Sequence, residues 1–437
     1  MGSLVAASAS AVDGHAVVGR VIFVIFVAAV TVATSEESAG DRAGVVEADG
    51  AGALHVNSSN PELEPVLLNG VDALSVLRRQ QEAVQEQHEL IHSQTSQAAS
   101  LQEKLCTLHP PYSGQIFGAG SGTHKWAGGV LAPDGRIFGV PFSATSVLII
   151  NPATNTLDTT TITGLPSDQL KWHDGVLSRH NNNNNNNAIY CFPSNHDSVL
   201  KIDPSTNTAD WSSITGVGGG ALKFRSGVVG NNGLVYGIPY VSDFVLIVDP
   251  ATDSLDKTTL GGLSQAPHKW QGGVVAPDGR IFCIPRSANA VLIIDPDTNT
   301  LDTTSIRGLE VTAGGAQWIG GVLAGNGLIY GIPYTSDAVL LISPDNNTAD
   351  TTTITGLNAT QQWFGGVLAA NGKVAGIPRD SGAILVVDPA SSTAEATTLS
   401  DLHIAHNRFN GGVLAANGHI YAIPEDAEAV LVFSLGC

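Results

Sequence analysis

The sequence predicts an all-β fold, a single seven-bladed β-propeller over residues 112–437. Three observations carry this prediction: a sevenfold repeat, four short strands in each repeat, and an N-terminal strand that completes the last repeat. In each repeat an aromatic residue is followed three positions later by a glycine, and the repeats are about 46 residues apart. The aromatic residues are Trp126, Trp172, Phe224, Trp270, Trp318, Trp363 and Phe409.

The first repeat shows how the four strands are defined. Residues 129–132 and 136–140 are apolar segments joined by an Asp-Gly hairpin turn, and Pro141 ends the second strand. Residues 147–150 form the third strand and 157–162 the fourth, on either side of an Asn-Pro turn. Four short antiparallel strands per repeat are typical of a propeller blade.

The last repeat stops after its third strand, at residues 430–433. Residues 115–118 occupy the register of a fourth strand, so we expect an N-terminal strand to close the ring. In the same register Cys106 and Cys437 fall in one turn, which predicts a disulfide that staples the closure. Cys191 and Cys283 take equivalent positions in blades that are not adjacent, which favours buried free thiols.

The N-terminal part divides into three predicted segments. Residues 1–34 hold a thirteen-residue uncharged run, Val21 to Ala33, after Arg20. That run is short for a membrane span and suits a secretory signal peptide or a signal anchor. Residues 35–61 resemble a flexible linker. The chain is therefore expected to enter the secretory pathway and to be extracellular or at the cell surface, with any membrane attachment through this segment.

Residues 62–108 are predicted to form a helix. Apolar residues and polar residues alternate along a weak heptad seam, with Leu74, Leu77, Val84, Ile91, Ala98 and Leu105 as its apolar members. The seam fits a coiled-coil stalk that makes a homo-oligomer, and equally a solitary amphipathic helix that lies on the propeller.

Composition limits the partners. Lys and Arg number 20 against 39 Asp and Glu, a net charge of −19, which repels nucleic acid and anionic lipid. We found no catalytic motif, so a binding function is favoured over catalysis, and no cofactor is predicted beyond a calcium or transition-metal ion. The acids of the repeated D-P-x-T-N-T turns, such as Asp249, Asp295 and Asp388, favour turn capping over calcium binding.

Cationic residues precede most of the repeated aromatics. If they ring one mouth of the central channel, they could hold a carboxylate, sulfate or phosphate group; otherwise their stems pack on the neighbouring aromatic ring. The residues at this position are Lys125, Lys171, Lys223, Lys269, Gln317, Gln362 and Arg408.

Residues that break the repeat are further candidates, because duplication does not explain them. After the aromatic, blade two has His173 and Asp174, blade three has Arg225, and blade seven has Asn410. The His-Asp pair suits a catalytic base or a metal site, or else a local hydrogen bond. Asparagines in N-x-S/T sequons, candidates for glycosylation in a secreted chain, are Asn57, Asn346 and Asn358.

The runs VLIINPATNT at residues 147–156 and VLIIDPDTNT at residues 291–300 resemble the YVTN-type repeat of surface-layer propellers. The full repeat also resembles uncharacterised multi-repeat proteins of unicellular eukaryotes. These resemblances cover about three quarters of the chain and imply a propeller outside the cell, with no catalytic residue carried over. A more distant resemblance to lactonases and streptogramin lyases implies an axial site, without a matching ligand set.

Three functions follow as hypotheses. The first is a secreted or tethered module that binds a glycan or a protein. The second is a lyase or hydrolase acting at the channel mouth through His173 and Asp174. The third is a structural role in a coat or wall.

Overall fold

The computed structural model describes residues 45–48, 54–57, 67–68, 71–108, 111–179, 187–310, 315–357, 362–398 and 408–436. Within the N-terminal helix, side chains are described for residues 79–97. The chain divides into two compact units, Met1–Lys104 and Leu105–Cys437. The second unit carries the repeats.

The first unit contains two small hairpins and most of a long helix. Strand β1 (Val45–Ala48) pairs antiparallel with β2 (Leu54–Asn57), and β3 (Leu67–Leu68) pairs with β4 (Val71–Asp72). Helix α1 (Ala73–Leu108) follows directly. Its Gln-, Glu- and Ala-rich sequence has high helix propensity and contains neither Gly nor Pro.

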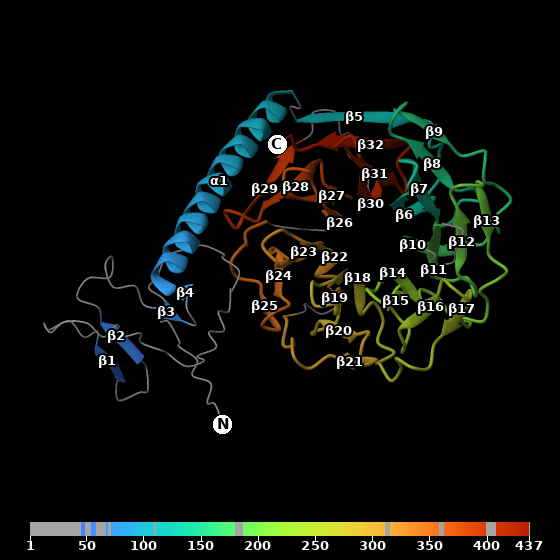
Figure 1. Cartoon of the computed structure of the whole chain (residues 1–437). Helices are drawn as coiled ribbons and strands as arrows, with labels where there is room; N and C mark the ends of the chain where they lie inside the picture. The colour runs from blue at the N-terminus through green and yellow to red at the C-terminus, as the bar shows by residue number, and fades with distance from the viewer. Residues whose placement is uncertain are drawn as a thin grey trace, which may run out of the picture. The chain divides into compact units, whose positions relative to one another are not determined.

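The second unit is a ring of seven four-stranded antiparallel sheets (Figure 1), which confirms the predicted seven-bladed propeller. In blades one to six the strands pair in chain order, as a meander. Blade one comprises β6 (Trp126–Leu131), β7 (Ile137–Pro141), β8 (Leu148–Asn151) and β9 (Thr156–Asp158). Blade two comprises β10 (Trp172–Arg179), β11 (Asn187–Pro193), β12 (Leu200–Asp203) and β13 (Thr208–Asp210).

The next four blades repeat this order. Blade three has β14 (Phe224–Val229), β15 (Val235–Pro239), β16 (Leu246–Asp249) and β17 (Ser254–Asp256). Blade four has β18 (Trp270–Val275), β19 (Ile281–Pro285), β20 (Leu292–Asp295) and β21 (Thr300–Asp302). Blade five has β22 (Trp318–Leu323), β23 (Ile329–Pro333), β24 (Leu340–Ser343) and β25 (Thr348–Asp350). Blade six has β26 (Trp363–Leu368), β27 (Val374–Pro378), β28 (Ala383–Asp388) and β29 (Thr393–Thr398).

Blade seven closes the ring as the sequence predicted. Its first three strands are β30 (Phe409–Leu414), β31 (Ile420–Pro424) and β32 (Ala429–Ser434), and its fourth is the N-terminal strand β5 (Tyr112–Phe117). Strand β5 runs antiparallel to β32, with Leu431 opposite Gln115 (Figure 1). The first strands of blades seven and one, β30 and β6, are neighbours. The sheet edges of both chain ends are thereby paired.

Neighbouring blades interlock through a glycine and an isoleucine. A Cβ atom built on Gly129 of blade one would lie 2.6 Å from Cδ1 of Ile423 in blade seven, so only glycine fits there. The same contact recurs between Gly321 and Ile284. The repeated Trp side chains fill the space between blades, and Trp126 Nε1 donates to the backbone oxygen of Ser146 at 2.9 Å. The aromatic and glycine of the repeat are therefore both packing requirements.

The fourth strands are shorter than predicted, and an aspartate explains why. In blade one the prediction ran to residue 162, but β9 ends at Asp158. The Asp158 carboxylate accepts hydrogen bonds from the backbone N–H groups of Thr160 at 2.7 Å and Thr161 at 3.1 Å, which turns the chain out of the ladder. Blade six has Glu395 at this position, and there β29 continues to Thr398.

The turn and cysteine predictions have separate outcomes. The aspartates of the repeated turns accept from the backbone two residues on, for example Asp249 Oδ1 from the N–H of Ala251 at 2.8 Å, so they act as turn caps. Cys191 and Cys283 are buried free thiols. The predicted Cys106–Cys437 disulfide lies outside the residues whose side chains are described.

Candidate functional site

Two residues of each blade meet around the propeller axis. The first follows the aromatic of the first strand, where a β-bulge interrupts the ladder and turns the side chain away from the sheet. The second follows the proline that ends the second strand. We call the two sets the axial cluster: Ala127, His173, Arg225, Gln271, Ile319, Phe364 and Asn410 from the first strands, and Phe142, Ser194, Tyr240, Arg286, Tyr334, Arg379 and Glu425 after the second.

Contacts between blades that are not neighbours place this cluster on the axis. Asn410 of blade seven bonds to His173 of blade two, with Nδ2 and Nε2 3.3 Å apart. The ring of His173 also lies 6.2 Å from that of Phe364 in blade six. Arg225 of blade three lies over the ring of Phe142 in blade one, at 5.6 Å from its centroid. The central opening is therefore lined and partly filled by side chains.

Three arginines alternate with aromatic rings along blades three to six. The Arg225 guanidinium lies 4.7 Å from the ring centroid of Tyr240. Arg286 lies between two rings, 5.2 Å from the centroid of Tyr240 and 5.9 Å from that of Tyr334. Arg379 lies 4.6 Å from Phe364. Stacking on aromatic faces holds a guanidinium in place, and Arg286 also donates from Nη1 to the Tyr240 hydroxyl. The series therefore presents cations in fixed positions.

One carboxylate faces this series. Glu425 is 2% exposed, and its Oε2 lies 3.3 Å from Nη1 of Arg379 and 3.0 Å from Nδ2 of Asn410. Its Oε1 lies 2.7 Å from Nδ1 of His124. Burial acts to raise the pKa of Glu425, but the His124 hydrogen bond, the Arg379 charge and the Asn410 amide outweigh it and lower the pKa. The hydrogen bond to Glu425 also raises the pKa of His124.

His173 is held neutral, with its proton assigned by its neighbours. Burial and the charges of the three arginines lower the pKa of His173 well below its usual value. Because Glu425 can only accept, Asn410 Nδ2 must be the donor to it, and the second N–H of that amide points to Nε2 of His173. The His173 proton is then on Nδ1, which lies beside the Arg225 carbonyl without a well-formed hydrogen bond.

The residue after His173 lies where the first strands of neighbouring blades approach one another most closely around the axis. Glycines of neighbouring blades approach closely there: a Cβ on Gly272 would be 2.6 Å from Cα of Gly320. Asp174 replaces glycine at this level with φ of 60°, and a Cβ on Gly128 would lie 2.5 Å from its Oδ1. Burial raises the pKa of Asp174 to about 7. No hydrogen bond between the His173 and Asp174 side chains is present, so the predicted pair does not act as a bonded dyad.

Polar atoms without partners gather in blades two to four of the axial cluster. They are Nδ1 of His173, Oγ of Ser194, Nε of Arg225, both amide atoms of Gln271 and Nε of Arg286, all buried. Buried polar atoms are rarely left without a hydrogen bond, and each such atom needs an explanation. Most of these groups are donors. This part of the cluster could therefore donate hydrogen bonds to a bound acceptor.

Of the two interpretations of the predicted lysines, the structure favours packing on the neighbouring ring: Nζ of Lys125, Lys171 and Lys269 lies 5.7–6.0 Å from the ring centroid of the tryptophan that follows. Lys269 Nζ donates to the backbone oxygens of Val241, Ser242 and Ala266 at 2.9–3.2 Å. The ammonium groups of Lys125, Lys171 and Lys223 also donate to backbone oxygens. Burial lowers the pKa of Lys171, Lys223 and Lys269 to about 8. These side chains fasten the loops around the axis, and the arginines supply the charge that faces it.

The other predicted residues lie around the same face. Gln317 is buried, and its backbone oxygen accepts from the N–H of Tyr334 at 2.8 Å. Arg408 lines a surface cleft in blade seven with Asp426 and Phe117. The backbone oxygen of Gln362 accepts from the N–H of Arg379 at 2.8 Å. Of the candidate glycosylation sites, Asn346 is exposed, Asn358 lies outside the described residues, and the side chain of Asn57 is not described.

Two groups of functional residues escaped the sequence prediction. The first is Arg286, Arg379 and Glu425. One signal could have found them: the residue after the repeated proline varies among the blades, and only Tyr and Arg occur there twice. The second corrects the expectation that the chain lacks a catalytic motif. His88-Glu89-Leu90-Ile91-His92 in α1 is an H-E-x-x-H run.

A further group of residues could hold a metal ion by position. His124, Glu425 and Asp426 bring ligand atoms within 4.8 Å of one another. Arg379 beside Glu425 opposes a cation at this place, because its charge lies 3.3 Å from the same carboxylate. We therefore assign these acids to the axial hydrogen-bond network.

Comparison with known proteins supports the fold alone. No family model matches the chain, and no curated protein is similar to it in sequence. Among solved structures, virginiamycin B lyase from Staphylococcus aureus has a TM-score of 0.59 at 10% identity, covering 75% of this chain and all of that one. A catalytically inactive His-to-Ala variant of that lyase, solved with quinupristin, has a TM-score of 0.58 at 11% identity over 75% of this chain and all of that one.

A second kind of neighbour is an extracellular domain. The extracellular domain of a putative one-component system from Bacteroides thetaiotaomicron has a TM-score of 0.55 at 10% identity, over 74% of this chain and 40% of that one. The same propeller architecture thus occurs in an enzyme and in an extracellular domain. The resemblance to surface-layer repeats stays a prediction. No helix among the described residues is long and apolar enough to cross a membrane.

Proposed function

We propose that the propeller is an extracellular binding module whose axial cluster takes a ligand that carries an oxyanion. The observation that supports this most is the set of buried, unpartnered donors on Arg225, Arg286 and their neighbours in blades two to four. An oxyanion accepts several hydrogen bonds at once, so one such group would satisfy donors from three blades. A carboxylate, a sulfate and a phosphate share this chemistry.

The charge of the cluster supports the same ligand. Three arginines face one carboxylate, and His173 is neutral, so the cluster is cationic in a chain of net charge −19. Burial lowers the pKa of Arg225 and of Arg286, which means that the cations are incompletely compensated. A bound anion would compensate them. Repulsion from the rest of the acidic surface would favour ligands in which the anion is a small part.

The aromatic rings between the arginines favour a glycan or a protein side chain as the rest of the ligand. Phe142, Tyr240 and Tyr334 place ring edges beside polar groups, a combination that suits sugar rings and peptide groups, and of the three Tyr334 is the most exposed, at 7%. Secretion, predicted from residues 1–34, would place the module outside the cell. The structure and the sequence together favour binding over a coat or wall role, because a purely structural propeller has no use for unpartnered axial donors.

Replacing one axial arginine tests this proposal. Titration calorimetry of the full chain with sulfate, phosphate and glucuronate is expected to show binding of at least one of them. Arg225→Gln should weaken that binding by at least about tenfold, because a charge-assisted hydrogen bond is lost. Arg307→Gln, which removes an exposed arginine from the propeller surface, is the matched control. Equal affinities of the two variants, or no binding of any oxyanion, would refute the proposal.

A lyase or hydrolase at the same cluster is the second candidate. The likeness to virginiamycin B lyase is its support, and that likeness is of fold alone. His173 would be the proton-transfer group, since it is neutral at pH 7 and lies at the axis. Turnover of a bound ligand that is abolished by His173→Gln would establish this function, whereas binding without turnover would leave the module as proposed.

A further inference from the structure

The H-E-x-x-H run of α1 forms a pair of imidazoles with a defined geometry. His88 and His92 are four residues apart, so they lie on one face of the helix. Their Nε2 atoms are 3.1 Å apart, and their rings meet edge to face with centroids 4.5 Å apart. Both side chains are exposed.

This separation is close to what one metal ion requires. In a tetrahedral site with Zn–N bonds of about 2.0–2.1 Å, two ligand nitrogens are about 3.3 Å apart. The observed distance differs by only a few tenths of an ångström, within the reach of a small rotation of either ring. We propose that His88 and His92 together bind a Zn²⁺-like divalent transition-metal ion, and that the same pair of a second copy completes its coordination.

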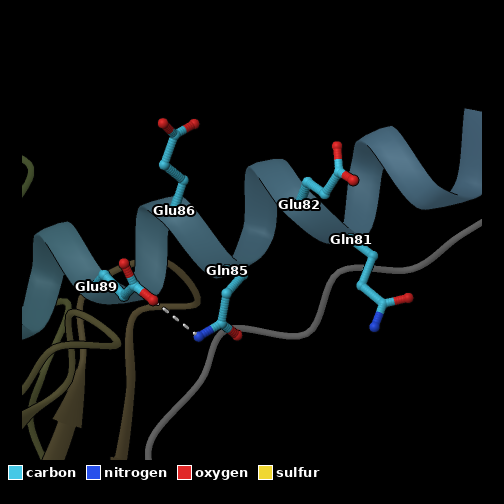
Figure 2. A pocket seen from close by; sticks show the side chains of 5 residues that line it. All are labelled: Gln81, Glu82, Gln85, Glu86 and Glu89. Atoms are coloured by element: carbon cyan, nitrogen blue, oxygen red, sulfur yellow. Dashed lines mark hydrogen bonds between the residues drawn. The ribbon is translucent and has the colours of Figure 1, made fainter.

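The motif is associated with metalloproteases, where its glutamate acts as a base. Here the surroundings differ. Every described side chain of α1, residues 79–97, is exposed, and Glu89 accepts a hydrogen bond from Gln85 with Nε2 and Oε1 3.3 Å apart (Figure 2). Among the described residues nothing encloses the pair as a substrate cleft would. The geometry therefore fits an ion that holds chains together.

A second copy is the partner because α1 presents an uncharged face beside the histidines. Within residues 79–97, the heptad seam runs through Val84, His88 and Ile91. Besides the histidines, the seam and its flanking positions carry Gln, Thr and apolar residues. Val84 and Ile91 are 64% and 60% exposed. Two of the three acids of this stretch, Glu82 and Glu86, project from the side of the helix opposite to Gln81 and Gln85 (Figure 2). The third, Glu89, lies at the edge of the seam, where it accepts the hydrogen bond from Gln85.

This distribution of charge removes the main obstacle to self-association. A chain with net charge −19 repels its copies unless the contact face is neutral. A tetrahedral ion on a twofold axis uses the same two ligands from each copy, which is the symmetric arrangement of most dimers. The contact would also bury the apolar seam, although each copy alone leaves it in water.

The test uses the full chain, purified without a polyhistidine tag and stripped with EDTA. Zinc binding is measured by equilibrium dialysis with metal analysis, and mass by sedimentation equilibrium with and without Zn²⁺. We expect one ion per two chains and a zinc-dependent dimer. Losing a ligand should weaken zinc binding by at least about tenfold in His88→Gln, since even outer-shell changes cost about 10–100-fold.

A matched control keeps the number of histidines constant. The double variant His92→Gln with Ser93→His moves the second imidazole from position i+4 to i+5, off the shared face, and should bind zinc no better than His88→Gln. Equal zinc binding by the natural chain and this variant would overturn the proposal. A natural chain that binds no zinc in the dialysis experiment would overturn it too. One ion per monomer, lost in both variants, would overturn the part played by the second copy.

Discussion

Individual residues at the axis differ where the rest of the repeat is constant. The residue after the repeated aromatic is Ala, His, Arg, Gln, Ile, Phe and Asn in blades one to seven. In each blade it lies on the first strand, at the β-bulge. The bulge costs the ladder a pair of hydrogen bonds, but it gives each blade one side chain directed at the axis. Differences among blades therefore reside in single side chains.

Asp174 is the residue at which pH should matter most. Its pKa is raised to about 7, so between about pH 4 and pH 7 the folded chain keeps a proton that the unfolded chain has released. Stability should thus fall as pH rises through this window. Asparagine also tolerates positive φ, so Asp174→Asn should keep the backbone conformation. It should reduce the loss of unfolding free energy across this pH window by on the order of 1–3 kcal/mol. Urea unfolding at pH 5 and pH 8 measures it.

The control for this measurement is Asp345→Asn in an exposed turn, which should leave the pH dependence of the natural chain unchanged. Identical pH profiles of Asp174→Asn and the natural chain would show that the carboxyl is not desolvated in solution.

At the scale of elements, one carboxylate sets the length of a strand. The fourth strand has three residues in blades one to five, where it ends in Asp, and six residues in blade six, where Glu395 replaces Asp. The longer side chain of glutamate does not form the local bonds that Asp158 makes with Thr160 and Thr161. A difference of one methylene group thus decides whether the chain stays in the sheet.

Asp158→Ala should destabilise the propeller by about 1 kcal/mol at pH 7, after allowance for the partial exposure of the carboxylate. The hydrogen bonds of Thr161 and Thr160 lower the pKa of Asp158 to about 2. This contribution is present above about pH 4 and is lost as pH falls toward 2. Glu395→Gln should have almost no effect in the same chemical-denaturation measurement, and a comparable loss in both variants would contradict the role given to Asp158.

For the whole molecule, closure by β5 is the decisive feature. Without β5, strand β32 of blade seven would have an unpaired edge and the ring would lack its last strand. A chain starting at residue 105 keeps β5 and should unfold in one cooperative transition. A chain starting at residue 119 should lose that cooperativity and aggregate, which light scattering and calorimetry would show. Equal behaviour of the two truncations would mean that closure contributes little.

Sequence reasoning found the scaffold and part of the axial cluster, and it missed the rest for physical reasons. The aromatic, the glycine and the proline recur because every blade needs the same packing, so Trp126 and Gly129 identify themselves by repetition. Glu425 does not recur, and only folding brings it within reach of Asn410 and Arg379. The lysines did recur, and their bonds to backbone oxygens show that their repetition reflects loop anchoring.

The glycine–isoleucine contact between blades has a consequence for how such a chain can change. Gly129 accepts Ile423 of the preceding blade, and five of the seven seams repeat this contact, so most blades are fitted to their neighbours through residues outside the axial cluster. A blade that kept these contacts could be exchanged, or its two axial residues rewritten, with the neighbouring seams left intact. The contacts between blades are thus separate from the residues that face the axis, so new binding specificity can evolve one blade at a time.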